Sequence, residues 1–377
     1  MDDLRISLLH SPYAPSYLWQ ILLCYMSLQK DEAFIKDESP QAIRGTMQHA
    51  YLCYLLSKHF GIKCDIDPDI KDKLEADEIE EVNEVFRRVI EEYNYLKRKY
   101  ARVDVYLEKE VCLDNYLPNP AWGTLDVALV GHRAKKVGGY YRGSTIEIID
   151  AKFGRVKVDV RCKYNDKYII NPQLCAYWCG LYEAIKDEHD FIKGVFLIAQ
   201  PKIHNYPSLI CPADEVVDCM ERVIAPAIFD AAEGKGKYNP SLSNCAHCKN
   251  AIHCKYHHEQ ALLLKPLVEA TDMIDDKTLE ESVLPNVVNL KKYCDKIIDY
   301  CIKRAEEGKK WKGFVLTSCR PTRVFIDEAK ARDIALANGY KGFVVESTLS
   351  PAQAEKLMTK PVFSELLGDL VTFKPGK

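Results

Sequence analysis

Two carboxylates and a lysine lie within or directly after apolar segments of this chain. Asp126 lies within the segment GTLDVALV, and Asp150 and Lys152 end the segment STIEIIDAK. The alternation of a strand places Asp150 and Lys152 on one face. Charges in segments that otherwise resemble buried strands are costly unless they meet a cation. Mg²⁺ and Mn²⁺ prefer oxygen ligands, and a fixed lysine stabilises phosphate charge, so the set predicts metal-dependent phosphodiester hydrolysis.

A helix predicted between residues 172 and 186 adds two polar groups to this set. Gln173 and Tyr177 are four residues apart in NPQLCAYW, so they share one face of that helix. We expect Gln173 and Tyr177 to hold the site residues in place or to contact the nucleic-acid strand that carries the phosphodiester.

The elements that position these residues follow from the apolar periodicity. Residues 1–100 carry apolar side chains at helical spacing, which predicts a helical N-terminal region. Short segments rich in β-branched and aromatic residues then predict four strands, with the helix between the third and the fourth. These segments are 103–113, 122–132, 144–154 and 191–201. The order predicts an α/β fold, with a mixed central sheet flanked by helices and a crossover that delivers the last strand.

The composition predicts a chain of two parts. We place a first domain at 1–262, with a helical part at 1–100, a catalytic core at 101–210 and a cysteine cluster at 240–258. Residues 263–377 carry helical segments and one predicted strand, FVLTSC, which indicates a small α+β accessory domain. The chain has no run of about 18 apolar residues, which excludes a membrane span. The opening MDDLRISLLH lacks the features of a signal peptide, so we expect an intracellular, cytoplasmic protein.

The charge pattern permits nucleic acid as a partner. A formal net charge of −3 gives no global attraction to phosphate, but a local basic stripe is enough for binding. Basic and aromatic residues lie together directly after Lys152, and they predict contacts to DNA. These residues are Arg155, Lys157, Arg161, Lys163, Tyr164, Lys167 and Tyr168.

Cysteines form a second group of candidate ligands. Fifteen cysteines in a chain without an export signal favour thiols over disulfides. Cys245, Cys248 and Cys254 have the spacing C-x2-C-x5-C, which suits an iron–sulfur cluster or zinc. Zinc would need a fourth ligand from the neighbouring histidines His247, His253, His257 and His258.

The acidic and helical motifs together resemble those of the RecB-like branch of the PD-(D/E)XK nucleases. Gly45, Thr46 and His49 in RGTMQHAYL look like the GTxxH helix of this branch. The resemblance implies a restriction-endonuclease-like core in which His49, Asp126, Asp150 and the Ala151 carbonyl hold one or two Mg²⁺ or Mn²⁺ ions. Lys152 would position or deprotonate the attacking water and stabilise the phosphate charge.

The cysteine spacing resembles that of the iron–sulfur nucleases, namely the AddB-type recombination nuclease and the CRISPR-associated RecB-like exonucleases. In these proteins a fourth cysteine lies far upstream of the nuclease core. The resemblance implies a structural 4Fe–4S cluster on Cys24, Cys245, Cys248 and Cys254. Cys53, one helical turn after His49, is the alternative to Cys24, and zinc is the alternative to iron.

Nearly the whole chain also resembles a family of phage- and prophage-encoded RecB-like proteins of unassigned function. Trp311, Lys312 and Arg320, and then the stretch 350–356, carry this likeness. It implies a DNA exonuclease in phage replication or recombination, inside a bacterial host, with recombination or single-strand-binding proteins as partners. The alternative is a catalytically silent nucleic-acid-binding or scaffold module that keeps a structural metal cluster.

Overall fold

The protein forms two compact units, Met1–Lys296 and Ile297–Lys377. The computed structural model describes residues 11–28, 40–134, 143–188, 190–245, 248, 250, 254–256, 259, 277, 280, 283–315, 322–340, 350–358 and 360–374. The domain boundary predicted after residue 262 lies outside the described residues. Among the described helices, none is long and apolar enough to cross a membrane.

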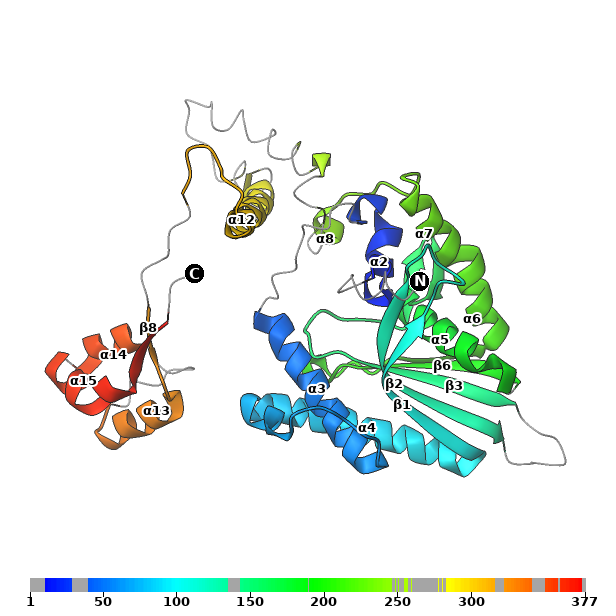
Figure 1. Ribbon diagram of the computed structural model, residues 1–377, viewed down its shortest axis with the longest axis horizontal. Helices are drawn as coiled ribbons and strands as arrows, with labels where there is room; N and C mark the ends of the chain where they lie inside the picture. The colour runs from blue at the N-terminus through cyan, green and yellow to red at the C-terminus, as the bar shows by residue number, and fades with distance from the viewer. Residues whose placement is uncertain are drawn as a thin grey trace. The chain divides into compact units, whose positions relative to one another are not determined.

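A five-stranded sheet forms the centre of the first unit (Figure 1). Its spatial order is β1-β2-β3-β6-β7, and every neighbouring pair is antiparallel except β3 and β6, which are parallel. The strands are β1 (Tyr100–Cys112), β2 (Trp122–Ala134), β3 (Ser144–Ala151), β6 (Phe191–Ala199) and β7 (Ser208–Pro212). Helix α5 (Pro172–Ile185) connects β3 to β6. The predicted mixed sheet with a helical crossover is therefore confirmed.

Helices cover both faces of this sheet (Figure 1). One face packs against α2 (Pro15–Leu23), α5, α6 (Ala213–Cys219), η5 (Met220–Ile224) and α7 (Ala225–Ala232). The other face packs against α3 (Pro40–Phe60) and α4 (Ala76–Lys99). Ile148 belongs to the first core and the adjacent Ile149 to the second, because successive strand residues point to opposite faces. Both residues are fully buried, so β3 is the buried strand that the sequence predicts, and it is the middle strand of the sheet.

A helix cap and side-chain contacts fix the two helices that carry site residues, α5 and α3. Helix α5 starts at Asn171, whose side chain accepts a hydrogen bond from Gln173 N, with Pro172 in its first turn. Helix α3 is held against α4 by an ion pair between Arg44 and Glu78 and by a hydrogen bond from Gln48 Nε2 to Glu81 Oε2 of 2.8 Å. The short helices η1 (Tyr25–Ser27), η2 (Pro68–Lys73), η3 (Lys186–Glu188), η4 (Pro201–Ile203) and α8 (Leu242–Cys245) complete the unit.

The structure adds elements where the sequence predicts only loops. Strands β4 (Arg161–Tyr164) and β5 (Lys167–Ile170) form a separate antiparallel hairpin between β3 and α5. Asn165 and Asp166 make its turn with φ angles of 46° and 63°, a conformation that these residue types tolerate better than most. Strand β7 pairs with β6 at the edge of the sheet. It is short and largely exposed, and its sequence shows no clear alternation of apolar and polar residues.

The second unit is a small α+β body, as the sequence predicts. Helix α12 (Leu284–Glu306) spans the division between the units, and Trp311 Nε1 donates to the Cys301 carbonyl at 2.9 Å. Of the predicted strand FVLTSC, Phe314 and Val315 lie outside any strand, and the remainder, like Arg320, lies outside the described residues. The later elements are β8 (Thr322–Phe325), α13 (Glu328–Ala337), α14 (Pro351–Met358), α15 (Lys360–Leu367), η9 (Gly368–Leu370) and β9 (Val371–Lys374).

Candidate metal centre

Two carboxylates face each other across strands β1 and β2. The register pairs Leu107 with Val127 and Lys109 with Leu125, so Glu108 stands opposite Asp126. Glu108 has a φ of 45°, the left-handed region that non-glycine residues rarely occupy. Like charges directly opposite on neighbouring strands destabilise a sheet. The backbone conformation and the charge pair each carry a local cost, and a bound cation would offset that of the charge pair.

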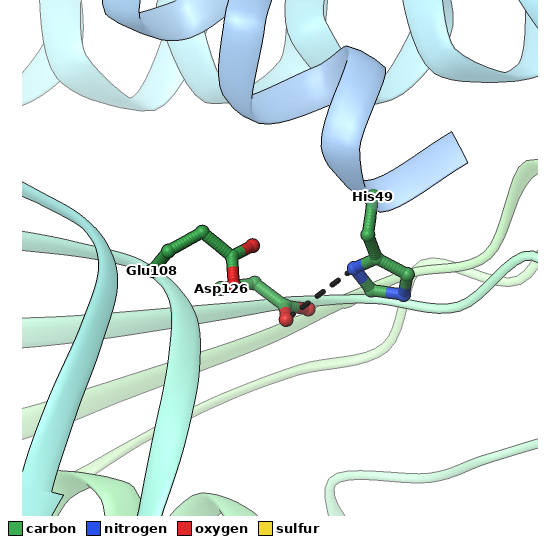
Figure 2. Close-up of side chains that lie close together, drawn as sticks. All are labelled: His49, Glu108 and Asp126. Atoms are coloured by element: carbon green, nitrogen blue, oxygen red, sulfur yellow. Dashed lines mark ion pairs between the residues drawn. The ribbon is translucent and has the colours of Figure 1, made fainter. Parts of the chain in front are cut away.

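Helix α3 brings His49 to the same place, as Figure 2 shows. His49 Nδ1 lies 3.4 Å from Asp126 Oδ1, and its ring makes an edge contact with Phe153 at a centroid distance of 5.1 Å. One ligand atom from each of His49, Glu108 and Asp126 lies within 4.8 Å of the others. Within the described residues, this trio of histidine and carboxylate atoms is the set that is close enough to share one ion.

Asp150, Lys152, Gln173 and Tyr177 form a connected network beside this trio. Lys152 Nζ donates to Asp150 Oδ1 at 3.1 Å and to Gln173 Oε1 at 3.3 Å. Gln173 Nε2 donates to Asp150 Oδ1 at 3.0 Å and to Tyr177 Oη at 3.3 Å. The structure thus brings together all four residues that the sequence singled out on β3 and α5. The amide of Gln173 holds the carboxylate and the lysine in fixed positions.

The backbone of β3 joins the network to the trio. Ala151 N donates to Asp126 Oδ2 at 2.8 Å, and Lys152 N donates to the Ala199 carbonyl of β6 at 2.9 Å. Asp150 lies outside the set of atoms within 4.8 Å, but it is one residue from this link. We call His49, Glu108, Asp126, Asp150 and Lys152 the carboxylate centre.

Gly123, three residues before Asp126, allows close packing between strand β2 and helix α2. A Cβ atom at this position would lie 2.4 Å from Cδ of Pro15 and 3.5 Å from the Tyr177 ring. The first residue of α2 therefore packs directly on β2, three residues before Asp126, and only glycine leaves room for it.

Charges within the centre shift the pKa values of its members in opposite directions. Burial would raise the pKa of Asp126, but His49, Lys152 and the Ala151 amide outweigh burial and hold it below its usual value. At Asp150, in contrast, burial is the dominant effect and Lys152 opposes it only in part, so the pKa of Asp150 is raised. Burial would lower the pKa of Lys152, yet Asp150 and Asp126 raise it. Lys152 is therefore a fixed cation in this arrangement.

The pKa values of His49 and Glu108 are raised as well. Burial would lower the pKa of His49, but the charge and hydrogen bond of Asp126 raise it. Removal from solvent, followed by the charge of Asp126, raises the pKa of Glu108 to about 7. A cation would favour the deprotonated carboxylate and the neutral imidazole that ligation needs.

The donor set passes a simple test of its fit to a divalent cation. Asp150 Oδ2 is buried and makes no hydrogen bond within the described part of the chain, although Lys152 Nζ lies 2.9 Å away as an ion pair. Three further oxygen or nitrogen ligands stand close by on His49, Glu108 and Asp126. The carboxylate oxygens are hard ligands that suit Mg²⁺ or Mn²⁺, and the single imidazole nitrogen is a borderline ligand.

Glu108 is the member of the centre that the sequence analysis missed. It lies in the predicted strand 103–113, but nothing in YLEKEVCL separates it from its acidic neighbour Glu110. The identification depends on the register between β1 and β2. If the pairing of β1 with β2 had been predicted, the position of Glu108 opposite Asp126 would have identified Glu108 as a candidate ligand.

The four predicted cysteine ligands lie together in the first unit. Cys24, Cys245, Cys248 and Cys254 are all buried, although they come from residues far apart in sequence. Burial, and then the thiols of Cys254 and Cys24, raise the pKa of Cys245. Burial, and then Cys245 and Cys254, raise the pKa of Cys248 to about 11. We call these four residues the cysteine centre.

Backbone contacts hold the Cys24 segment beside the other three cysteines. Tyr25 N donates to the Lys237 carbonyl at 2.9 Å, and Asn250 Nδ2 donates to the Met26 carbonyl at 2.6 Å. The alternative ligand Cys53 lies elsewhere, with its sulfur 3.8 Å from Ser57 Oγ and close to Cys64 and Glu108. The structure therefore groups Cys24, and not Cys53, with the C-x2-C-x5-C motif. The alternative ligands His247, His253, His257 and His258 lie outside the described residues.

The separation of the thiols bears on which metal they could hold. Tetrahedral zinc with Zn–S bonds of about 2.3 Å brings its sulfurs to roughly 3.8 Å from one another. Across the described residues, no three of these cysteine sulfurs lie within 4.8 Å of one another. An iron–sulfur cluster keeps its thiolates further apart than a single ion does, because each binds a different iron.

Comparison with known proteins places the chain in a family whose function is unknown. Residues 10–377 match the family described as "Protein of unknown function (DUF2800)". No curated protein and no solved structure matches the chain.

Proposed function

Because the chain belongs to the DUF2800 family of proteins of unknown function, we propose from its own residues that it is a metal-dependent DNA nuclease. The observation that carries the proposal is the meeting of Glu108, Asp126 and His49 within 4.8 Å, where β1 and β2 face helix α3. The adjacent Asp150, Lys152 and Gln173 network supplies the fixed cation that phosphodiester hydrolysis needs.

We further propose that the first unit is a PD-(D/E)XK nuclease domain. The mixed sheet with its β3–α5–β6 crossover supports this assignment, because it presents Asp126, Asp150 and Lys152 at neighbouring strand positions. The proposed role is that of an exonuclease in phage replication or recombination.

The proposed mechanism assigns one task to each side chain. A divalent ion held by His49, Glu108, Asp126 and Asp150 would supply Lewis-acid activation of the scissile phosphate and of water. Lys152 holds its proton and stabilises negative charge on the phosphate, because Asp150 and Asp126 raise its pKa. This supports the electrostatic role of Lys152 over that of a base. Gln173 keeps Asp150 and Lys152 in register, and Tyr177 braces Gln173.

For the cysteine centre we propose a structural 4Fe–4S cluster. Four buried thiols from two distant parts of the chain support it. Cys24 at the end of α2 would be joined to Cys245, Cys248 and Cys254. Such a link restrains a very long stretch of chain, so the cluster would stabilise the fold of the first unit.

The test is cleavage of end-labelled linear DNA and of covalently closed circular DNA, with Mg²⁺, with Mn²⁺ and with EDTA. We expect metal-dependent loss of linear DNA in the wild type and none in Lys152→Ala. Lys58→Ala is the matched control, because Lys58 is an exposed lysine on α3, the helix that carries His49.

Each outcome of the cleavage test has a defined meaning. Loss of linear DNA alone identifies an exonuclease, and cleavage of circles as well identifies an endonuclease. Undiminished cleavage by Lys152→Ala would overturn the site assignment. DNA binding without cleavage in either metal would replace the nuclease with a nucleic-acid-binding module.

A further inference from the structure

A loop directly after Lys152 is held in place by the side chains of Gln200 and Asn205. Gln200 is fully buried, and its Nε2 donates to the carbonyls of Gly154 and Val156, each at 2.8 Å. Its Oε1 accepts from Val158 N at 3.2 Å, and Asn205 Nδ2 donates to the Val158 carbonyl at 2.7 Å. The backbone of loop 154–158 is therefore fixed from inside the protein.

The exposed side chains of this loop are cationic or apolar. Arg155 and Lys157 are exposed, and Val156 between them is 74% exposed. Neither Arg155 nor Lys157 has an ion-pair partner in the described part of the chain. Because the backbone is already fixed, only side-chain entropy is lost when such an unpaired charge meets a phosphate.

The β4–β5 hairpin follows immediately and is anchored beside α5. Asn171 closes its base, since Asn171 N donates to the Val160 carbonyl and Asn171 Nδ2 donates to the Asp159 carbonyl, each at 2.9 Å. Asn171 is also the residue that caps α5 and accepts from Gln173 N. The hairpin is thus tied to the helix that carries Gln173 and Tyr177.

The two tyrosines of this hairpin have different surroundings. Tyr164 is half-buried against the core, and Lys237 Nζ lies 5.9 Å from its ring centroid. Tyr168 is 69% exposed and stands opposite Lys163 in the register of the hairpin. Tyr164 has a packing role, whereas the Tyr168 ring is open to solvent, and Lys163 opposite it is ion-paired with Asp166 at 3.1 Å. A large exposed aromatic ring beside cations is what a stacked base with its phosphate requires.

We propose that loop 154–158 and the β4–β5 hairpin form a binding surface for single-stranded nucleic acid, on which Tyr168 stacks against an unpaired base. Arg155, Lys157 and Lys167 contact the phosphates that flank this base. The surface leads away from Lys152 along the chain, so it delivers the strand to the carboxylate centre. This inference rests on the proposed nuclease function for its purpose, but the binding surface can be tested without cleavage.

The experiment measures binding of fluorescently labelled single-stranded oligodeoxynucleotides and of the matching duplex by anisotropy, with EDTA present to prevent cleavage. Tyr168→Ala is expected to weaken single-strand binding by about 5- to 100-fold, and Tyr168→Phe is expected to retain it, because stacking needs only the ring. Replacing Arg155 and Lys157 with alanine should reduce the salt dependence of log K by about 0.7 for each phosphate that is no longer neutralised.

Tyr95→Ala is the matched control for Tyr168→Ala. Tyr95 is an exposed tyrosine on α4 beside a lysine, but Lys99 Nζ already covers its ring at 4.0 Å from the centroid. Its replacement should leave binding unchanged. Because Tyr168 is exposed, circular dichroism and thermal unfolding of its variants should match those of the wild type.

Three outcomes would overturn the proposal: absence of single-strand binding by the wild type, equal binding by Tyr168→Ala, or an equal loss in Tyr95→Ala. Tighter binding to duplex than to single strands, unaffected by Tyr168→Ala, would also contradict it. Failure of the surface is separable from failure of the nuclease. A protein that binds through Tyr168 but never cleaves keeps the surface, and one that cleaves with an unimportant Tyr168 keeps the nuclease alone.

Discussion

The carboxylate centre and the cysteine centre of the first unit position their residues by different means. In the carboxylate centre, strand register fixes Glu108, Asp126 and Asp150, and a helix cap fixes the adjacent Gln173. In the cysteine centre, Cys24 follows α2, whereas Cys248 and Cys254 lie in a stretch with little regular structure among its described residues. The difference agrees with our proposal that the fold builds the first site, whereas the metal cluster proposed for the second site would help to stabilise the fold.

Loss of a catalytic charge should separate activity from stability most strongly. Asp150→Asn is expected to reduce cleavage by roughly 1,000-fold or more, because it removes a charged ligand of the divalent ion that would activate the phosphate and the water. The free energy of unfolding should be unchanged or higher, since Asp150 is buried and its pKa is raised. Cleavage rates and urea unfolding of the same preparations check this. A large loss of stability would mean that the carboxylate centre is structural.

Loss of a cysteine ligand should have the reverse effect. Cys24→Ser is expected to remove the bound iron and sulfide and to lower the free energy of unfolding by about 2–5 kcal/mol, if the cluster acts as a long-range cross-link. Cys53→Ser should keep the iron, because Cys53 lies beside Ser57 and Cys64 instead. Iron and sulfide analysis with thermal unfolding gives the comparison. Iron retained in Cys24→Ser and lost in Cys53→Ser would reassign the fourth ligand.

Glu108 tests whether the structure has identified a true member of the carboxylate centre. Glu108→Gln is expected to raise the Mg²⁺ concentration for half-maximal cleavage by about tenfold, because one anionic ligand is lost. Glu110→Gln, two residues further along the same strand, is the matched control. An unchanged metal requirement in Glu108→Gln would remove Glu108 from the centre.

A buried glutamate away from both centres predicts a smaller, pH-dependent effect. Burial, and then the charge of Glu92, raise the pKa of Glu147 from 4.5 to about 8. The folded chain binds this proton more tightly than the unfolded chain does, so stability is full below about pH 4.5 and falls as the pH rises toward 8. The slope is at most about 1.4 kcal/mol per pH unit. Urea unfolding at about pH 6 and pH 8 should show it in the wild type and not in Glu147→Gln.

Much of the carboxylate centre could be predicted because its information is local. Asp150 lies in β3 and Lys152 directly follows it, and Gln173 and Tyr177 share a helix, so two- and four-residue spacing is enough to place each pair. The structure then brings both pairs together through hydrogen bonds. Strands β1, β2, β3 and β6 were predictable for the same reason, since each carries its own apolar pattern.

The features that sequence reasoning missed depend on contacts between distant segments. Glu108 is recognisable only from the pairing of β1 with β2, and Gln200 only from the carbonyls that it meets in loop 154–158. The β4–β5 hairpin was hidden because its exposed face carries lysine, tyrosine and arginine, which are typical of loops as well. The choice of Cys24 over Cys53 likewise follows from tertiary packing.

The most direct test of the account is Mn²⁺ binding by the metal-stripped protein, followed by electron paramagnetic resonance or calorimetry. Asp126→Asn should lose roughly tenfold to 100-fold in affinity, because Asp126 joins the other ligands of the carboxylate centre. Asp104→Asn is the control, because Asp104 also pairs with a histidine, with Oδ2 2.9 Å from His132 Nε2. The account predicts Mn²⁺ binding in the wild type and in Asp104→Asn, and weak binding in Asp126→Asn. Equal affinity in Asp126→Asn, or no binding by the wild type, would contradict it.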